Sequence, residues 1–109
     1  VYSERVRRVE ELLRRASREA TFVVLLTHYA PRCETLEGEN ERIWKYLSST
    51  ALRRAISRTK PNAVIHGHVH RGVRAVGYIE GVPVYNVSLP SLRKIALVRV
   101  APRGLEAFF

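Results

Sequence analysis

The chain has 109 residues, 46% hydrophobic and 27% charged, which predicts a single domain or part-domain spanning residues 1–109. Its longest apolar run is too short to cross a membrane, and no stretch resembles a signal peptide. A single cysteine, Cys33, excludes an internal disulfide framework. Low cysteine content is typical of a reducing compartment, so we expect a cytoplasmic protein.

The chain is strongly basic, with a formal net charge of +9. Such an excess favours polyanionic partners, nucleic acid among them, through non-specific electrostatics. The other interpretation is a solvated surface rich in arginine, and it is favoured because the basic residues are spread over the predicted helices.

Hydrophobic periodicity predicts an α/β domain in the order helix, strand, helix, strand and then a β-meander. An amphipathic helix is predicted over Ser3 to Ala20, and a strand buried on both faces over Thr21 to Thr27. A polar surface loop is expected over Arg32 to Asn40. A second helix is expected from about Ser49 to Arg58, capped by Ser48 or Ser49.

A short helical turn is expected around Trp44, before the second helix, and the central strand is expected to begin at Ala63. The rest of the chain is predicted to form strands. A turn is expected at Glu80-Gly81. Further strands are predicted over Val73 to Ile79, Val82 to Val87, Ile95 to Val100 and Leu105 to Phe109.

Histidines follow two of these strands. The stretch 63–70 reads Ala-Val-Ile-His-Gly-His-Val-His, and His28 closes the strand before it. Ligands of open α/β sheets gather outside the carboxyl ends of the strands, and imidazole is the commonest nitrogen donor for zinc, iron and manganese. His68 and His70 project to the same side of extended backbone. Gly67 permits a sharp departure from the strand and leaves room for a ligand. The pattern predicts a metal site.

Several polar residues near these strand ends have alternative interpretations. His66 is expected to fill the strand end or orient a neighbour, and not to bind metal. Cys33 completes a possible mononuclear site with the three other histidines, although a lone cysteine is usually inert. Tyr29 and Asn86 are candidates for contact with a substrate or for satisfying backbone groups.

These motifs resemble those of a known family. Leu25 to Pro31, Ile65 to His70 and Val84 to Ser88 are similar, in order and spacing, to the last motifs of the calcineurin-like metallophosphoesterases. The resemblance covers nearly the whole chain. It implies an αββα sandwich that holds two divalent metals, manganese, iron, zinc or nickel, between the C-terminal ends of two central sheets. It also implies that His28 and His68 bind one metal and His70 the other.

The resemblance implies hydrolysis of a phosphate monoester or diester. Two cations about 3.5–4 Å apart can clamp a phosphoryl oxygen and lower the pKa of a bridging water. The family's earlier motifs, an aspartate–x–histidine, a glycine–aspartate and a glycine–asparagine–histidine, are missing, and the chain contains no aspartate. Without a bridging carboxylate, two divalent cations repel each other. No catalytic set is therefore complete in this chain.

We therefore expect the C-terminal half of a metallophosphoesterase domain, inactive without its N-terminal half. The absence of methionine and the start at Val1 agree with an incomplete reading frame. The expected fold is half of a four-layer αββα sandwich: a mixed sheet flanked by helices, with a C-terminal antiparallel meander. Its sheet is expected to expose apolar surface, which predicts the missing half or a homodimer as a partner.

Two other functions remain as alternatives. One is a basic nucleic-acid-binding module, which arginines gathered on a single face would favour. The other is a non-catalytic relic of the family that binds at most one metal.

Overall fold

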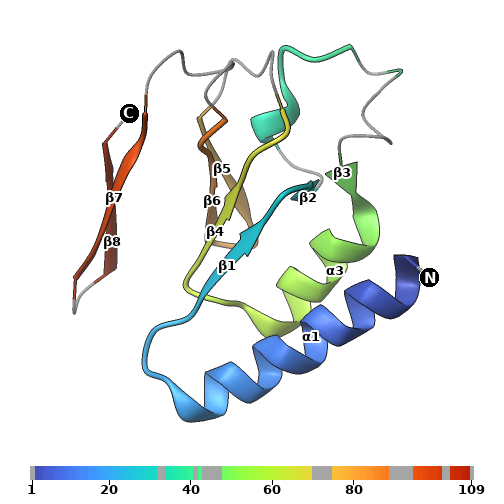
Figure 1. Ribbon diagram of the computed structural model, residues 1–109, viewed down its shortest axis with the longest axis vertical. Helices are drawn as coiled ribbons and strands as arrows, with labels where there is room; N and C mark the ends of the chain where they lie inside the picture. Colours follow the sequence, from blue (N-terminus) through green and yellow to red (C-terminus); the bar gives the residue numbers. More distant parts are fainter. Residues whose placement is uncertain are drawn as a thin grey trace.

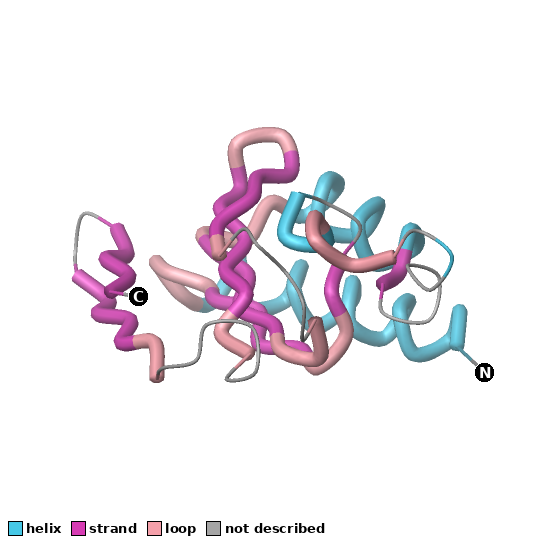
Figure 2. Tube along the Cα trace, turned by 90° about the horizontal axis from the view of Figure 1, so that it is seen from above, coloured by secondary structure: helices cyan, strands magenta, loops and turns pink. Residues whose placement is uncertain are grey.

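The computed structural model describes residues 2–31, 34–40, 42, 48–69, 75–88, 95–101 and 104–108. These residues form an α/β arrangement in which two helices lie on one face of a mixed four-stranded sheet (Figure 1). Figure 2 shows both helices on the same side of the strands. The predicted α/β class and the mixed sheet are confirmed.

The first helix, α1 (Tyr2–Glu19), matches the predicted amphipathic helix to within a residue. Leu13 is buried, and Val9 packs against the main core, because these positions recur at the helical period. Most of the remaining side chains of α1 are charged and exposed. Across the described part of the chain, no helix combines the length and the apolar character needed to cross a bilayer.

The second helix, α3 (Thr50–Thr59), begins and ends as its sequence predicts. The Oγ of Ser49 accepts a hydrogen bond of 2.9 Å from the Leu52 amide, which is an N-cap. Lys60 ends the helix in the left-handed region with φ 47°. Leu52 and Ile56 face the sheet and are buried.

The four-stranded sheet determines where the residues that follow each strand lie. Three strands run parallel, and the fourth is antiparallel to the third. A strand–helix–strand connection predicts a parallel pair, and the first two strands are one. Register pairs Thr27 with His66 and His66 with Asn86, so all three parallel strands finish at one edge. In spatial order the strands are β1 (Val24–Thr27), β4 (Ala63–His66), β6 (Val82–Asn86) and β5 (Val76–Ile79).

The predicted meander is split into two hairpins. Glu80 and Gly81 join β5 to β6 with φ values of 46° and 86°, the left-handed pair that a two-residue hairpin requires. Among the described strands, the second hairpin, β7 (Leu97–Ala101) with β8 (Gly104–Phe108), pairs only within itself. It cannot continue the meander beside β6, because β4 and β5 already occupy both edges of that strand. The continuous meander was therefore wrong.

The sheet has one covered face and one open face. Val64 and Val84 lie side by side on the covered face and pack against α3 in the main core. Because side chains alternate along a strand, the intervening residues point away from both helices. Leu26 is 76% exposed, so the prediction that the first strand is buried on both faces was wrong. The sequence run was apolar, but α1 and α3 both cover the same side.

The region expected to be a polar surface loop is partly buried, so that prediction was also wrong. It contains the 3-10 turn η1 (Glu34–Leu36), in which Thr35 and Leu36 are fully buried. Leu36 packs in a second small core with Ala30 and Val69. The two short strands beside it are β2 (Ala30–Pro31) and β3 (Ser48–Ser49). The helical turn predicted around Trp44 lies outside the described residues.

Burial predicts a large difference between two leucines. Leu52 is 5% exposed in the main core and Leu26 is 76% exposed on the open face. We expect Leu52→Ala to lower the free energy of unfolding by about 2–5 kcal/mol, and Leu26→Ala to change it by at most about 0.5 kcal/mol. Urea unfolding followed by circular dichroism measures both variants. Equal losses would contradict the assignment of the two faces.

Candidate functional site

The candidate site lies where β1 and β4 end side by side. His28 follows the last residue of β1, and His68 comes two residues after the end of β4. Their imidazole ring centres are 4.5 Å apart, with a tilt of 41° between the ring planes. The Tyr29 ring lies edge-on to both imidazoles, at 5.1 Å from each. Two of the three predicted ligands are therefore neighbours, and Tyr29 flanks them.

His68 reaches this position through an unusual backbone conformation. Its φ is 69°, in the left-handed region, and the Val69 amide donates a 2.9 Å hydrogen bond to the Gly67 carbonyl. This bond closes a three-residue γ-turn with His68 at its centre, in the rarer and strained form. A β-carbon on Gly67 would meet no atom within 4 Å. The sharp turn expected of Gly67 therefore falls on His68.

Asn86 anchors the turn from the neighbouring strand. Its side chain is fully buried, and its Nδ2 donates a 3.3 Å hydrogen bond to the Val69 carbonyl. Its Oδ1 accepts a 3.0 Å bond from the Ser88 amide. Both ends of the carboxamide therefore hold backbone, and the end of β6 fixes the turn that carries His68. This contact accounts for Asn86 without a substrate.

His66 is fully buried directly beneath the turn. Its Nε2 lies 2.8 Å from Thr35 Oγ1, and its Nδ1 lies 2.9 Å from the Gly67 carbonyl oxygen. Burial lowers the pKa of this imidazole, and the bond to Gly67 offsets the effect in part. In the neutral ring Nδ1 donates to the carbonyl and Nε2 accepts from the threonine hydroxyl. Both ring nitrogens have protein partners, as expected of a residue that fills a strand end.

Thr35 is the residue at this site that sequence reasoning missed. It lies in a polar stretch that was expected to be a surface loop, and no local pattern marks it as buried. Its hydroxyl contacts His66 only because the chain folds back over the end of β4. A buried imidazole needs such a partner, so the buried His66 was the only signal that a donor would be near.

Tyr29 also borders a hollow on the helix side. The hollow measures about 250 Å³ and contains one cation, Arg5, near the start of α1. Tyr29 itself is 44% exposed, so its ring is accessible from outside. The remaining lining is mostly apolar and consists of Val6, Val9, Thr27 and Leu52.

The imidazole pair is a ring-to-ring contact, with centres 4.5 Å apart. Neutral imidazole is a common nitrogen donor for metals. His70 and Cys33 lie outside the described residues, so their places relative to this pair are not assigned. Within the described ranges, no group of three or more His, Cys, Asp or Glu side chains gathers in one place. The described residues therefore bring two predicted ligands, His28 and His68, into contact.

Comparison of the chain with protein-family models, with curated proteins and with solved structures returned no match.

The strained turn predicts that alanine and glycine variants rank in opposite orders of stability at His68 and at His28. Glycine adopts a positive φ without steric cost, so we expect His68→Gly to be more stable than His68→Ala by about 1 kcal/mol. His28 is not among the positive-φ residues. At that position we expect the opposite order, with the alanine variant more stable. Urea unfolding of the four variants tests this, and the same order at both positions would rule out strain at His68.

Proposed function

We propose that this chain is the C-terminal half of a metal-dependent phosphoric-ester hydrolase domain and that it is inactive alone. The observation that carries the proposal is the contact between His28 and His68. The two residues are far apart in the sequence, yet their rings lie 4.5 Å apart at the carboxyl ends of adjacent parallel strands. This is the edge of an α/β sheet where ligands bind, and imidazole pairs are typical metal donors.

The open face of the sheet supports the half-domain interpretation. One row of apolar and aromatic side chains crosses all four strands on the face away from the helices, in the order Leu26, Ile65, Tyr85 and Val76. Leu26 at its edge is 76% exposed, whereas Tyr85 is 9% exposed. Tyr78 adds a half-exposed ring to the same face. An apolar sheet face of this kind normally packs against another layer. In the proposed αββα sandwich, the N-terminal half of the domain supplies that layer.

Each of the chain's own residues at the site would have a separate role. His28 and His68 would hold one ion, with His70 as the ligand that the family resemblance assigns to a second. When bound, divalent metals supply Lewis-acid activation of the ester and of a water. Asn86 and the γ-turn keep the His68 ring beside His28. The exposed Tyr29 flanks both rings and is positioned to contact a substrate.

The proposed inactivity of the isolated chain follows from its donor set. The sequence contains no aspartate, and among the described residues no glutamate joins the imidazole pair in a metal-binding group. A two-metal centre needs an anion between its cations to offset their repulsion. That carboxylate must come from the partner half.

The first test is metal binding. We expect titration calorimetry with Zn²⁺, Ni²⁺ and Mn²⁺ to detect weak binding of one ion, since few donors are present. His28→Ala and His68→Ala should each weaken binding at least tenfold, because each removes one nitrogen donor. Glu19→Gln, which removes an exposed carboxylate at the C-terminal end of α1, is the control and should bind as tightly as the parent. Affinity that survives both histidine changes would favour a non-catalytic relic with no site at these residues.

The second test is complementation. Co-expression with a segment that carries the missing aspartate motifs should give manganese-dependent hydrolysis of bis(p-nitrophenyl) phosphate, whereas the 109-residue chain alone should give none. His68→Ala should abolish the restored activity.

A control for this experiment separates association of the two halves from hydrolysis of the ester. Leu26→Lys puts a charge on the open face without touching the histidines, so it should prevent the two halves from co-purifying. If the halves bind each other through this face but no metal restores activity, the hydrolase proposal is wrong and the shared fold remains.

A further inference from the structure

A basic surface surrounds the exposed side of α3 and the adjoining part of α1. Val6 lies beside Ala51, and Arg18 lies beside Thr59, so α1 and α3 run in the same direction. Two hollows of about 240 and 300 Å³ lie between the two helices, and a third of about 460 Å³ lies on the other side of α3, beside the end of β5. Arg58 borders all three of them. We call this surface the arginine groove.

The groove has a large excess of positive charge. Among the described residues that line it are two glutamates, Glu10 and Glu80, and six arginines: Arg7, Arg14, Arg18, Arg53, Arg54 and Arg58. Glu10 is shared, since one oxygen lies 2.9 Å from Arg58 and the other 3.4 Å from Arg14. Arginines therefore outnumber glutamates among the described lining residues by six to two.

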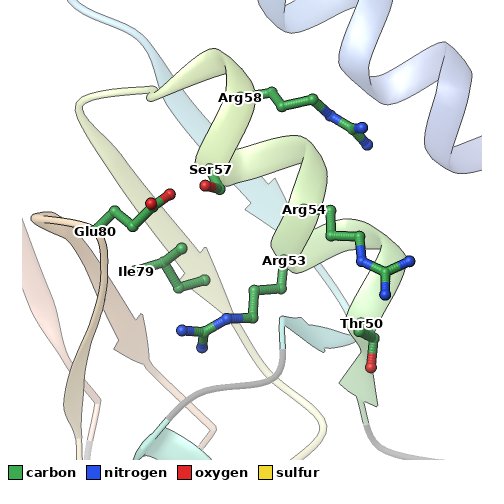
Figure 3. Close-up of a pocket in the computed structure, with 7 residues that line it drawn as sticks. All are labelled: Thr50, Arg53, Arg54, Ser57, Arg58, Ile79 and Glu80. Carbon is green, nitrogen blue, oxygen red and sulfur yellow. The ribbon is translucent and has the colours of Figure 1, made fainter.

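The charge pattern of α3 is unfavourable for an isolated helix. The helix contains three arginines and no acidic residue. Arg54 and Arg58 are one turn apart, a like-charge pair that costs about 0.2–0.5 kcal/mol. Figure 3 shows both side chains extending from the α1 side of α3, while Arg53 extends on the side of β5. An anion in the groove would relieve this repulsion.

We propose that the arginine groove binds the phosphodiester backbone of duplex nucleic acid, independently of base sequence. Guanidinium groups match phosphate oxygens with paired hydrogen bonds. Arg7 to Arg18 spans about 16 Å of helix, which equals the axial rise of roughly five base pairs of a duplex. The hydroxyl of Ser57 lines the same groove and is a further phosphate donor, whereas those of Ser17 and Thr59 donate to the carbonyls of Leu13 and Ala55.

The lining also discriminates between classes of polyanion. Its described residues include no Phe, Trp or Leu, the residues that anchor a helix in a lipid surface. The same described residues include no aromatic ring on which single-stranded bases could stack. Of these classes of polyanion, the lining therefore favours a nucleic-acid duplex that is contacted through its backbone. This proposal does not depend on the hydrolase proposal, because the arginines of the groove are not among the residues of the imidazole pair or of the hollow beside Tyr29.

The test is fluorescence anisotropy with a labelled 20-base-pair DNA of mixed sequence, titrated with the full 109-residue chain between 50 and 300 mM salt. The double variant Arg7→Gln/Arg54→Gln removes one groove cation from each helix. We expect it to weaken binding about tenfold at 100 mM salt and to reduce the slope of log affinity against log salt by about 2.

The matched control removes the same charge elsewhere. Arg8 and Arg15 are exposed, make ion pairs with Glu11 and Glu19, and lie on the side of α1 away from α3. Arg8→Gln/Arg15→Gln should change the affinity less than threefold. Equal losses in the two double variants would overturn the proposal, since total charge alone would then explain binding. So would no detectable binding at 50 mM salt.

A second assay, with lipid vesicles, tests the other phosphate-bearing polyanion, an anionic membrane surface. We expect that Arg7→Gln/Arg54→Gln does not abolish any binding of the chain to vesicles with 30% phosphatidylserine. If that variant loses vesicle binding and keeps duplex binding, the groove recognises an anionic lipid surface and the nucleic-acid proposal is wrong. Circular dichroism of every variant confirms that the helices are intact.

Discussion

The parallel pairing of β1 with β4 is the constraint on which the candidate site depends. It aligns Thr27 with His66, so the chain leaves both strands at the same height and His28 meets the loop that carries His68. A shift of register by one residue would turn every side chain of a strand to the opposite face. It would bury Leu26, expose Leu25 and separate the two imidazoles. Asn62 reinforces the register at the other end, because its side-chain oxygen and its amide both bond the backbone of Val23.

Much of this arrangement could be predicted from the sequence. Helical periodicity located α1, serine capping located the start of α3, and the Glu80-Gly81 pair located the turn between β5 and β6. These features are local, so each depends on a few neighbouring residues. The meeting of His28 with His68 was also predictable, because parallel strands share a carboxyl edge.

Other features depend on contacts between distant segments, and no local pattern could reveal them. The burial of Thr35 needs His66 above it, and the exposure of Leu26 follows from both helices lying on one face of the sheet. The left-handed turn falls on His68 and not on the glycine before it, because Asn86 and the buried Val69 hold that loop. The arginines appeared scattered in the sequence, yet those of two helices face one groove once α1 and α3 lie side by side.

The shared direction of the two helices has an electrostatic consequence at the imidazole edge. Arg5 and Val6, near the start of α1, border the same hollow as Thr27 and Tyr29, and α3 begins directly after β3, which pairs with the segment that follows Tyr29. Both helices therefore direct the positive ends of their macrodipoles, about half an elementary charge each, toward this edge of the sheet. The resulting field attracts an anion approaching the imidazoles and opposes a bare cation. For the proposed hydrolase, this field would favour a metal that arrives together with a phosphate ester over a metal that arrives alone.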